Sequence, residues 1–226
     1  MFCKRAGRRP AERGAAVKSE VILVHGLWFG AWAMAALARK LQVAGFAVRR
    51  FSYPSTAAQL DRHSLELLEF ARQSDASRQH FVGHSLGGLV MLHTLNQKND
   101  LPPGRIVLLG SPLDGSVIAR RSGRIPGGEK LLGQVKTALQ QGYGRLPEDR
   151  ETGMIAGTKS VGLGMLLGGA GRPGDGTVAV NETRTTGLKD HLLLPVTHTS
   201  MLYSAEVARQ AAHFLKTGGF DWPPAC

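Results

Sequence analysis

The chain has 226 residues with a net charge of +11, and its 42% hydrophobic content excludes a disordered or fibrous protein and fits one domain with one core. Residues 1–19 hold six Lys and Arg against Glu12 alone, so we expect a basic flexible tail there and one folded domain over residues 20–226. The other basic residues are spread without interleaved aromatics, which argues against a nucleic-acid surface. Cys3 and Cys226 stand at opposite ends and indicate no disulfide framework and no metal cluster.

Residues 21–38 contain no Asp, Glu, Lys or Arg and are about long enough to span a membrane. His25, Gly26 and Gly30 interrupt this stretch, so a buried strand, a loop and a helix are the better interpretation. Residues 1–19 show no secretory signal, which favours a cytoplasmic location. The basic balance also allows peripheral contact with an anionic membrane.

From residue 20 onward, short apolar runs alternate with amphipathic ones. Strands are predicted at residues 21–24, 47–53, 79–83, 105–109, 154–157 and 192–196, and helices at residues 31–44, 60–71, 86–95 and 201–215. This alternation is typical of right-handed βαβ units, so we expect an α/β fold whose mostly parallel sheet is flanked by helices.

Residues 113–148 interrupt this rhythm and contain no predicted strand. One amphipathic helix is expected over residues 129–141. Its apolar face would contain Leu131, Leu132, Val135, Ala138 and Leu139. The insertion can form a small helical cap or lid over a site, or it can pack permanently against the sheet. The glycine-rich segment 161–174 can line the same pocket.

The strongest chemical signal is Gly83-His84-Ser85-Leu86-Gly87, which matches the pattern G-x-S-x-G between a predicted strand and a predicted helix. A sharp turn at this place lifts the Ser85 hydroxyl above the sheet edge. It also crowds the positions two residues before and after Ser85, where only very small residues fit. We therefore predict that Ser85 is a nucleophile.

A serine nucleophile needs a base, and that base needs a third group to orient it. Of the eight histidines, His198 is the candidate base, because it follows the last predicted strand in a polar turn. His191 begins that strand at the wrong end, and His213 lies within a helix. The candidate acid is Asp175, in the tight loop Gly174-Asp175-Gly176, with Asp114 as the alternative.

Backbone N–H groups must also stabilise the negative charge that develops on the substrate oxygen. One donor should be Leu86, which follows the nucleophile. The other should come from the loop after the first strand, where Leu27 is the first choice and Trp28 the alternative.

These residues resemble the small bacterial esterases and lipases of the α/β-hydrolase superfamily. The resemblance covers most of residues 20–218, through the segments 24–28, 83–88, 175–178 and 198–203. It implies a Ser–Asp–His triad with no metal and no cofactor. Such lipases are usually secreted, and the smallest of them lack the insertion at residues 113–148.

The expected function is therefore hydrolysis of a carboxylic ester through an acyl-enzyme, with a small acyl ester or a lipid as substrate. The same triad also fits an acyltransferase, a thioesterase, an amidase or a lipid deacylase. A non-catalytic module that binds lipid or protein on a hydrolase fold is a third hypothesis, although such a module would not need a complete triad. The oligomeric state stays open.

Overall fold

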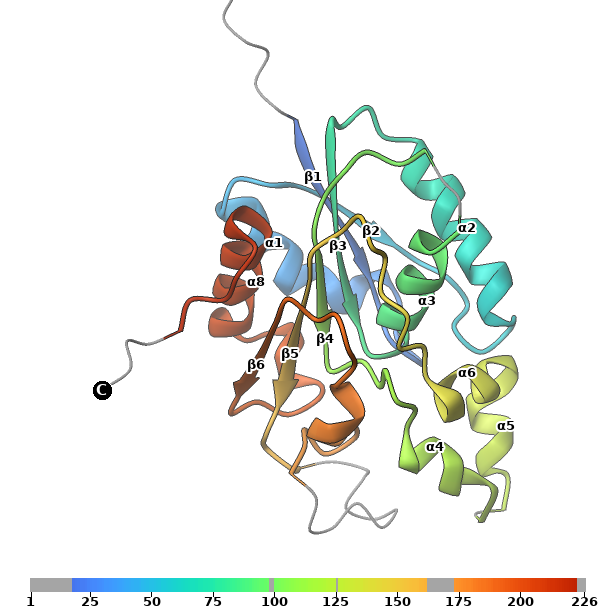
Figure 1. Cartoon of the computed structure of the whole chain (residues 1–226). Helices are drawn as coiled ribbons and strands as arrows, with labels where there is room; N and C mark the ends of the chain where they lie inside the picture. Colours follow the sequence, from blue (N-terminus) through green and yellow to red (C-terminus); the bar gives the residue numbers. More distant parts are fainter. Residues whose placement is uncertain (1–17, 98–99, 125, 162–172, 223–226) are drawn as a thin grey trace, which may run out of the picture.

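The computed structural model describes residues 18–97, 100–124, 126–161 and 173–222. One sheet of six strands, all parallel to their neighbours, forms the centre of the molecule in the order β2-β1-β3-β4-β5-β6 (Figure 1). The strands are β1 (Ser19–Val24), β2 (Ala47–Phe51), β3 (Arg78–His84), β4 (Ile106–Leu109), β5 (Thr152–Gly157) and β6 (Asp190–Leu194). Their carboxyl ends meet along the lower edge in Figure 1, and the predicted α/β fold with a mostly parallel sheet is confirmed.

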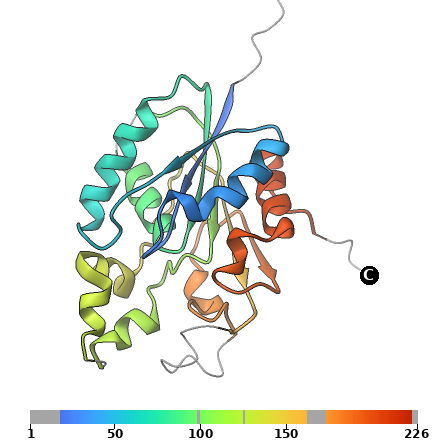
Figure 2. The ribbon, with the colours of Figure 1, turned by 180° about the vertical axis from the view of Figure 1, so that it is seen from behind.

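Helices cover both faces of this sheet. Figures 1 and 2 show α1 and α8 together on one face and α2 and α3 on the other. Their bounds are α1 (Ala35–Val43), which follows the 3-10 turn η1 (Ala31–Met34), α2 (Leu60–Arg72), α3 (Leu86–Leu95) and α8 (Ala205–Thr217). The last helix is shorter than predicted. The 3-10 turn η5 (Ser200–Leu202) precedes it, and the Ser204 hydroxyl accepts a hydrogen bond from the Val207 amide as its N-cap.

The core follows from the two-residue period of β1. Val21 and Leu23 point to the face covered by α1 and α8, whereas Ile22 and Val24 point to the face covered by α2 and α3. All four side chains are fully buried, as a continuous apolar run in a central parallel strand predicts. Residues 21–38 thus form a strand, a loop and a helix, and no helix in the described residues is long and apolar enough to cross a membrane.

The insertion lies beyond the carboxyl edge of the sheet, at the lower right in Figure 1. It contains α4 (Val117–Arg121), η2 (Ser122–Arg124), α5 (Gly128–Leu132), η3 (Gly133–Val135) and α6 (Lys136–Gln141). The prediction of one continuous helix over residues 129–141 is wrong. Gly133 adopts φ +57, and a Cβ there would lie 2.2 Å from the Thr56 carbonyl oxygen, so contact with the β2–α2 loop breaks the helix.

Leu131 does not share the buried face that the sequence predicted for it. Leu131 is 60% exposed, whereas Leu132, Val135 and Leu139 are buried in the core under α2 and α3. Two hydrogen bonds from Gln134 attach the insertion to the same loop, from its amide to the Thr56 carbonyl and from its side chain to the Ala57 carbonyl.

Two predicted segments fall largely outside the described residues. These are the basic tail, of which residues 1–17 are not described, and the glycine-rich segment, of which residues 162–172 are not described. β1 begins at Ser19, one residue inside the range that the sequence assigned to the tail.

Candidate active site

Ser85 occupies a strained turn between β3 and α3. Its backbone has φ +53, a region that non-glycine residues rarely adopt. A Cβ at Gly83 would lie 2.7 Å from the Gly88 backbone, and one at Gly87 would lie 2.3 Å from the Val24 carbonyl oxygen. Both positions therefore require glycine, as the sequence predicted. The Ser85 amide donates to the Leu109 carbonyl at 2.9 Å, which ties the turn to β4.

Asp175 and His198 meet beyond the carboxyl ends of β5 and β6. His198 Nδ1 lies 2.7 Å from Asp175 Oδ2, and the His198 amide donates to the Asp175 carbonyl at 2.8 Å. The other carboxylate oxygen accepts the amides of Thr177 and Val178 at 2.9 and 2.7 Å. Burial by itself raises the pKa of Asp175, but His198 and these two amides outweigh it and hold the pKa below its usual value.

This pairing sets the tautomer of His198. An ionised carboxylate only accepts hydrogen bonds, so in the neutral ring Nδ1 carries the proton and Nε2 has the lone pair. Among the described residues, neither His198 Nε2 nor Ser85 Oγ has a hydrogen-bond partner, and both residues line one cavity. In apo enzymes the bond between nucleophile and base often forms only when substrate is bound.

The loop after β1 lies directly against Ser85. A Cβ at Gly26 would be 3.0 Å from both the Ser85 Cβ and the His84 Nδ1. The Trp28 amide already donates to the Ser55 hydroxyl at 3.0 Å, whereas the Leu27 amide has no partner in the described part of the chain. The Leu86 amide belongs to the first turn of α3, where N–H groups have no earlier carbonyl to bond.

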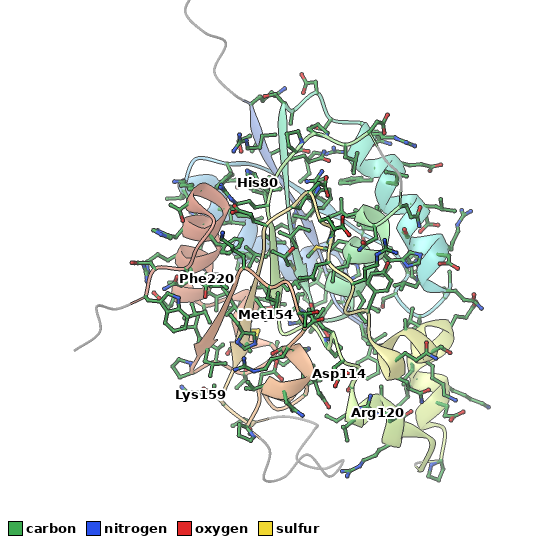
Figure 3. The ribbon with its side chains drawn as sticks, viewed as in Figure 1. His80, Asp114, Arg120, Met154, Lys159 and Phe220 are labelled. Carbon is green, nitrogen blue, oxygen red and sulfur yellow. The ribbon has the colours of Figure 1, made fainter. Side chains whose placement is uncertain are left out.

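The rejected candidates lie elsewhere. Asp114 is exposed and follows β4 towards α4, where Figure 3 labels it near Arg120. His191 shares a hydrogen bond of 2.9 Å with the Thr183 hydroxyl, next to η4 (Val180–Thr183). His213 lies in the middle of α8. The structure thus joins His198 to Asp175, whereas none of these three alternatives is bonded to Ser85 or His198 in the described residues.

The cavity at this edge has a volume of about 350 Å³. Ser85 and His198 share it with apolar side chains from the β1 loop and the insertion, among them Leu27, Ile118, Leu132 and Leu139. No Asp, Glu, Lys or Arg lines it among the described residues, and nowhere in these residues do three His, Cys, Asp or Glu side chains group as metal ligands would. The predicted helix over residues 129–141 therefore contributes to the pocket, although in two pieces.

Three features of the site had no clear signal in the sequence. His84 is fully buried beside His198, and its place in the pentapeptide did not reveal this contact. Gly110 directly follows the predicted strand 105–109, and nothing in the sequence indicates that a Cβ there would lie 2.8 Å from Asp175 Oδ2. The Trp28 indole donates to the Leu131 carbonyl at 2.8 Å and connects the β1 loop to the insertion.

Comparison with known proteins supports the fold that this site occupies. The family model described as the alpha/beta hydrolase family matches residues 21–214, and the chain belongs to this family. No curated protein is similar enough in sequence to count as a relative.

Several solved structures share the fold at low sequence identity. The mature form of the Bacillus licheniformis lipase BlEst2 superposes with a TM-score of 0.73 at 19% identity, covering 92% of this chain and 95% of that one. A metagenomic carboxyl esterase gives a TM-score of 0.72 at 17% identity, covering 94% and 81%. The phospholipase PlaB of Legionella pneumophila gives 0.64 at 16% identity, covering 87% and 55%. Esterases and lipases are thus among the structural neighbours of this alpha/beta hydrolase.

Proposed function

We propose that the protein hydrolyses neutral carboxylic esters through an acyl-enzyme on Ser85. The observation that carries this proposal is the pair Asp175–His198, with His198 and the strained Ser85 lining one cavity whose described walls are uncharged. A structural ion pair would not require a serine held at positive φ beside it, because such strain is retained mainly where function needs it.

In this mechanism His198 Nε2 takes the proton of the Ser85 hydroxyl while Oγ attacks the ester carbonyl carbon. The Asp175 carboxylate stabilises the imidazolium that forms, and the amides of Leu27 and Leu86 donate to the developing oxyanion. His198 then gives its proton to the departing alcohol, and water hydrolyses the acyl-enzyme with His198 again as the base.

The cavity suggests the class of substrate. Its volume of about 350 Å³ is at the small end of ligand sites, and its described walls carry no charge to pair with an ionised acyl group. We therefore infer short to medium acyl chains, which would lie between the β1 loop and the side chains of Leu132 and Leu139.

The test compares wild type and Ser85→Ala on p-nitrophenyl acetate, butyrate, octanoate and palmitate. The variant should lose about 10⁴- to 10⁶-fold in kcat while its circular dichroism stays unchanged. Ser74→Ala is the matched control, because Ser74 lies in the turn before β3 at the opposite edge of the sheet. Equal turnover by wild type and Ser85→Ala would refute the assignment of the nucleophile.

The same residues would also serve acyl transfer, thioester cleavage or amide cleavage. A thioester, an anilide and added acceptor alcohols therefore belong in the substrate panel. A fluorophosphonate that labels wild type and not Ser85→Ala would support the nucleophile for all of these reactions. Absence of labelling together with retained binding of lipid or protein would favour a non-catalytic module.

A further inference from the structure

His84 stands immediately before the proposed nucleophile and is fully buried. It ends β3 and forms part of the cavity wall next to Ser85. Its ring centroid lies 4.6 Å from that of His198, at an interplanar angle of 45°. The pentapeptide pattern leaves this position open to any residue, so the pattern does not account for a buried imidazole here.

Only one of the two ring nitrogens of His84 has a hydrogen-bond partner in the described residues. Its Nε2 lies 2.9 Å from the backbone carbonyl oxygen of His198, a contact that joins residues 114 positions apart. A carbonyl oxygen only accepts, so Nε2 carries the ring proton and Nδ1 keeps a lone pair. This Nδ1 is buried without a partner among the described residues. A buried acceptor left unpaired costs roughly 1–3 kcal/mol, so stability alone would favour an apolar side chain here.

His198 is otherwise held from one side only. Asp175 binds its ring through the carboxylate and its amide through the backbone carbonyl. His84 provides the only hydrogen bond to the remaining backbone group, the His198 carbonyl, within the described residues. Because His84 precedes Ser85 directly, this bond connects the turn of the nucleophile to the loop of the base.

We propose that His84 is a positioning residue that holds the His198 loop so that Nε2 faces Ser85. This inference rests on the proposed esterase function, since it concerns the geometry of that reaction. Misplacement of reacting groups by about 1 Å can reduce the rate about 100-fold. The gain in rate from the hydrogen bond between His84 and the His198 carbonyl therefore explains why a histidine stands here although its Nδ1 is unpaired.

The surroundings of His84 suit this role. Burial, followed by the proximity of His198, lowers the pKa of His84 to about 3, so the ring is neutral at working pH. The other titratable groups near it are Asp175 and His25, and burial also lowers the pKa of His25. A neutral ring donates its hydrogen bond without opposing the positive charge that His198 acquires during the reaction.

The test uses two amides that differ in length by one methylene. In His84→Gln the side-chain nitrogen can reach the position of Nε2, whereas in His84→Asn it is too short to do so. We expect His84→Asn, and His84→Met, which has no donor, to lose about 10- to 100-fold in kcat with KM changed by less than about threefold. His84→Gln should recover most of this loss. His213→Met is the matched control, because that ring makes no hydrogen bond in the described residues.

Two further measurements separate positioning from folding. The melting temperatures of the three variants should not follow their kcat values. His84→Met removes the buried, unpaired Nδ1, so this variant should lose activity without a matching loss of stability. The low-field proton signal of the His198 Nδ1–H should broaden in His84→Asn and His84→Met and persist in His84→Gln. Equal kcat in the Gln, Asn and Met variants would overturn this inference, and so would a loss of kcat that follows the melting temperature. In either case, ester hydrolysis by the wild type would leave the esterase proposal standing. If wild type neither turns over esters nor reacts with a fluorophosphonate, both proposals fall together.

Discussion

Gly110 provides a sharp test of the candidate site, because it lies against Asp175 and His198 and has no side chain of its own. It follows β4 with φ +56, and its amide donates to the Ile155 carbonyl at 2.9 Å. A Cβ in Gly110→Ala would lie 2.8 Å from Asp175 Oδ2 and 3.3 Å from His198 Nδ1. To reach an ordinary contact of 3.4 Å, the carboxylate would have to move by about 0.6 Å.

Two effects of this substitution can be separated. Left-handed backbone costs about 1–2 kcal/mol for alanine wherever it occurs, whereas the contact with Asp175 acts only at this position. Gly45 has φ +98, and apart from its chain neighbours no atom of the described residues lies within 4 Å of the place that an alanine methyl group would take there, so Gly45→Ala carries the backbone cost alone. Gly45→Ala should therefore lower the melting temperature by about 2–8 °C and leave kcat unchanged.

Gly110→Ala should lose more stability than Gly45→Ala and also about 10- to 100-fold in kcat, because the imidazole moves with the carboxylate. The assays are thermal melting by circular dichroism and turnover of p-nitrophenyl butyrate at a temperature where both variants are folded. Full activity in Gly110→Ala would refute the view that Asp175 and His198 must keep this geometry. An equal loss of activity in Gly45→Ala would mean that kcat follows global stability.

The other predictions concern the pocket, the insertion and pH. Leu139→Phe should reduce turnover of the octanoate ester relative to the acetate ester, since the larger ring occupies part of the cavity; an unchanged ratio would place the acyl chain elsewhere. Trp28→Phe removes the hydrogen bond to the Leu131 carbonyl, so amides of α5 should exchange hydrogen faster, and unaltered exchange would count against this tie. Burial lowers the pKa of His80 to about 4 and that of His84 to about 3, so the unfolded state binds more protons below the ordinary value of 6.5. The free energy of unfolding, measured with urea, should fall between pH 6.5 and 4 by up to about 1.4 kcal/mol per pH unit for each ring, and a flat profile would contradict the burial of these neutral imidazoles.

Local steric rules made much of the site predictable. A serine flanked by glycines between an apolar strand and a helix favours the sharp turn that the structure shows, and the close contacts at Gly83 and Gly87 follow from that turn. The parallel sheet was predictable as well, because alternating strands and helices leave few ways to connect. The position of His198 followed from this topology, since the carboxyl ends of parallel strands meet at one edge.

Other features depended on contacts between residues far apart in the chain. Periodicity predicted one helix over residues 129–141, but the close approach of the Thr56 carbonyl at Gly133 divides it. The sequence favoured Asp175 over Asp114 only because Asp175 lies in a tight glycine loop. The hydrogen bond between Asp175 and His198 is seen only in the tertiary structure.

The sequence by itself determined the turn at Ser85, the order of strands and helices, and the candidates for the acid and the base. These depend on local sterics and on the burial of short apolar runs. Only the tertiary structure decided that the Trp28 amide is bonded while that of Leu27 has no partner in the described residues, and that His84 holds the His198 carbonyl. These hydrogen-bond partners are 27 and 114 residues apart in the sequence. No periodicity or short-range spacing predicts such pairs, because only folding brings the partners close together.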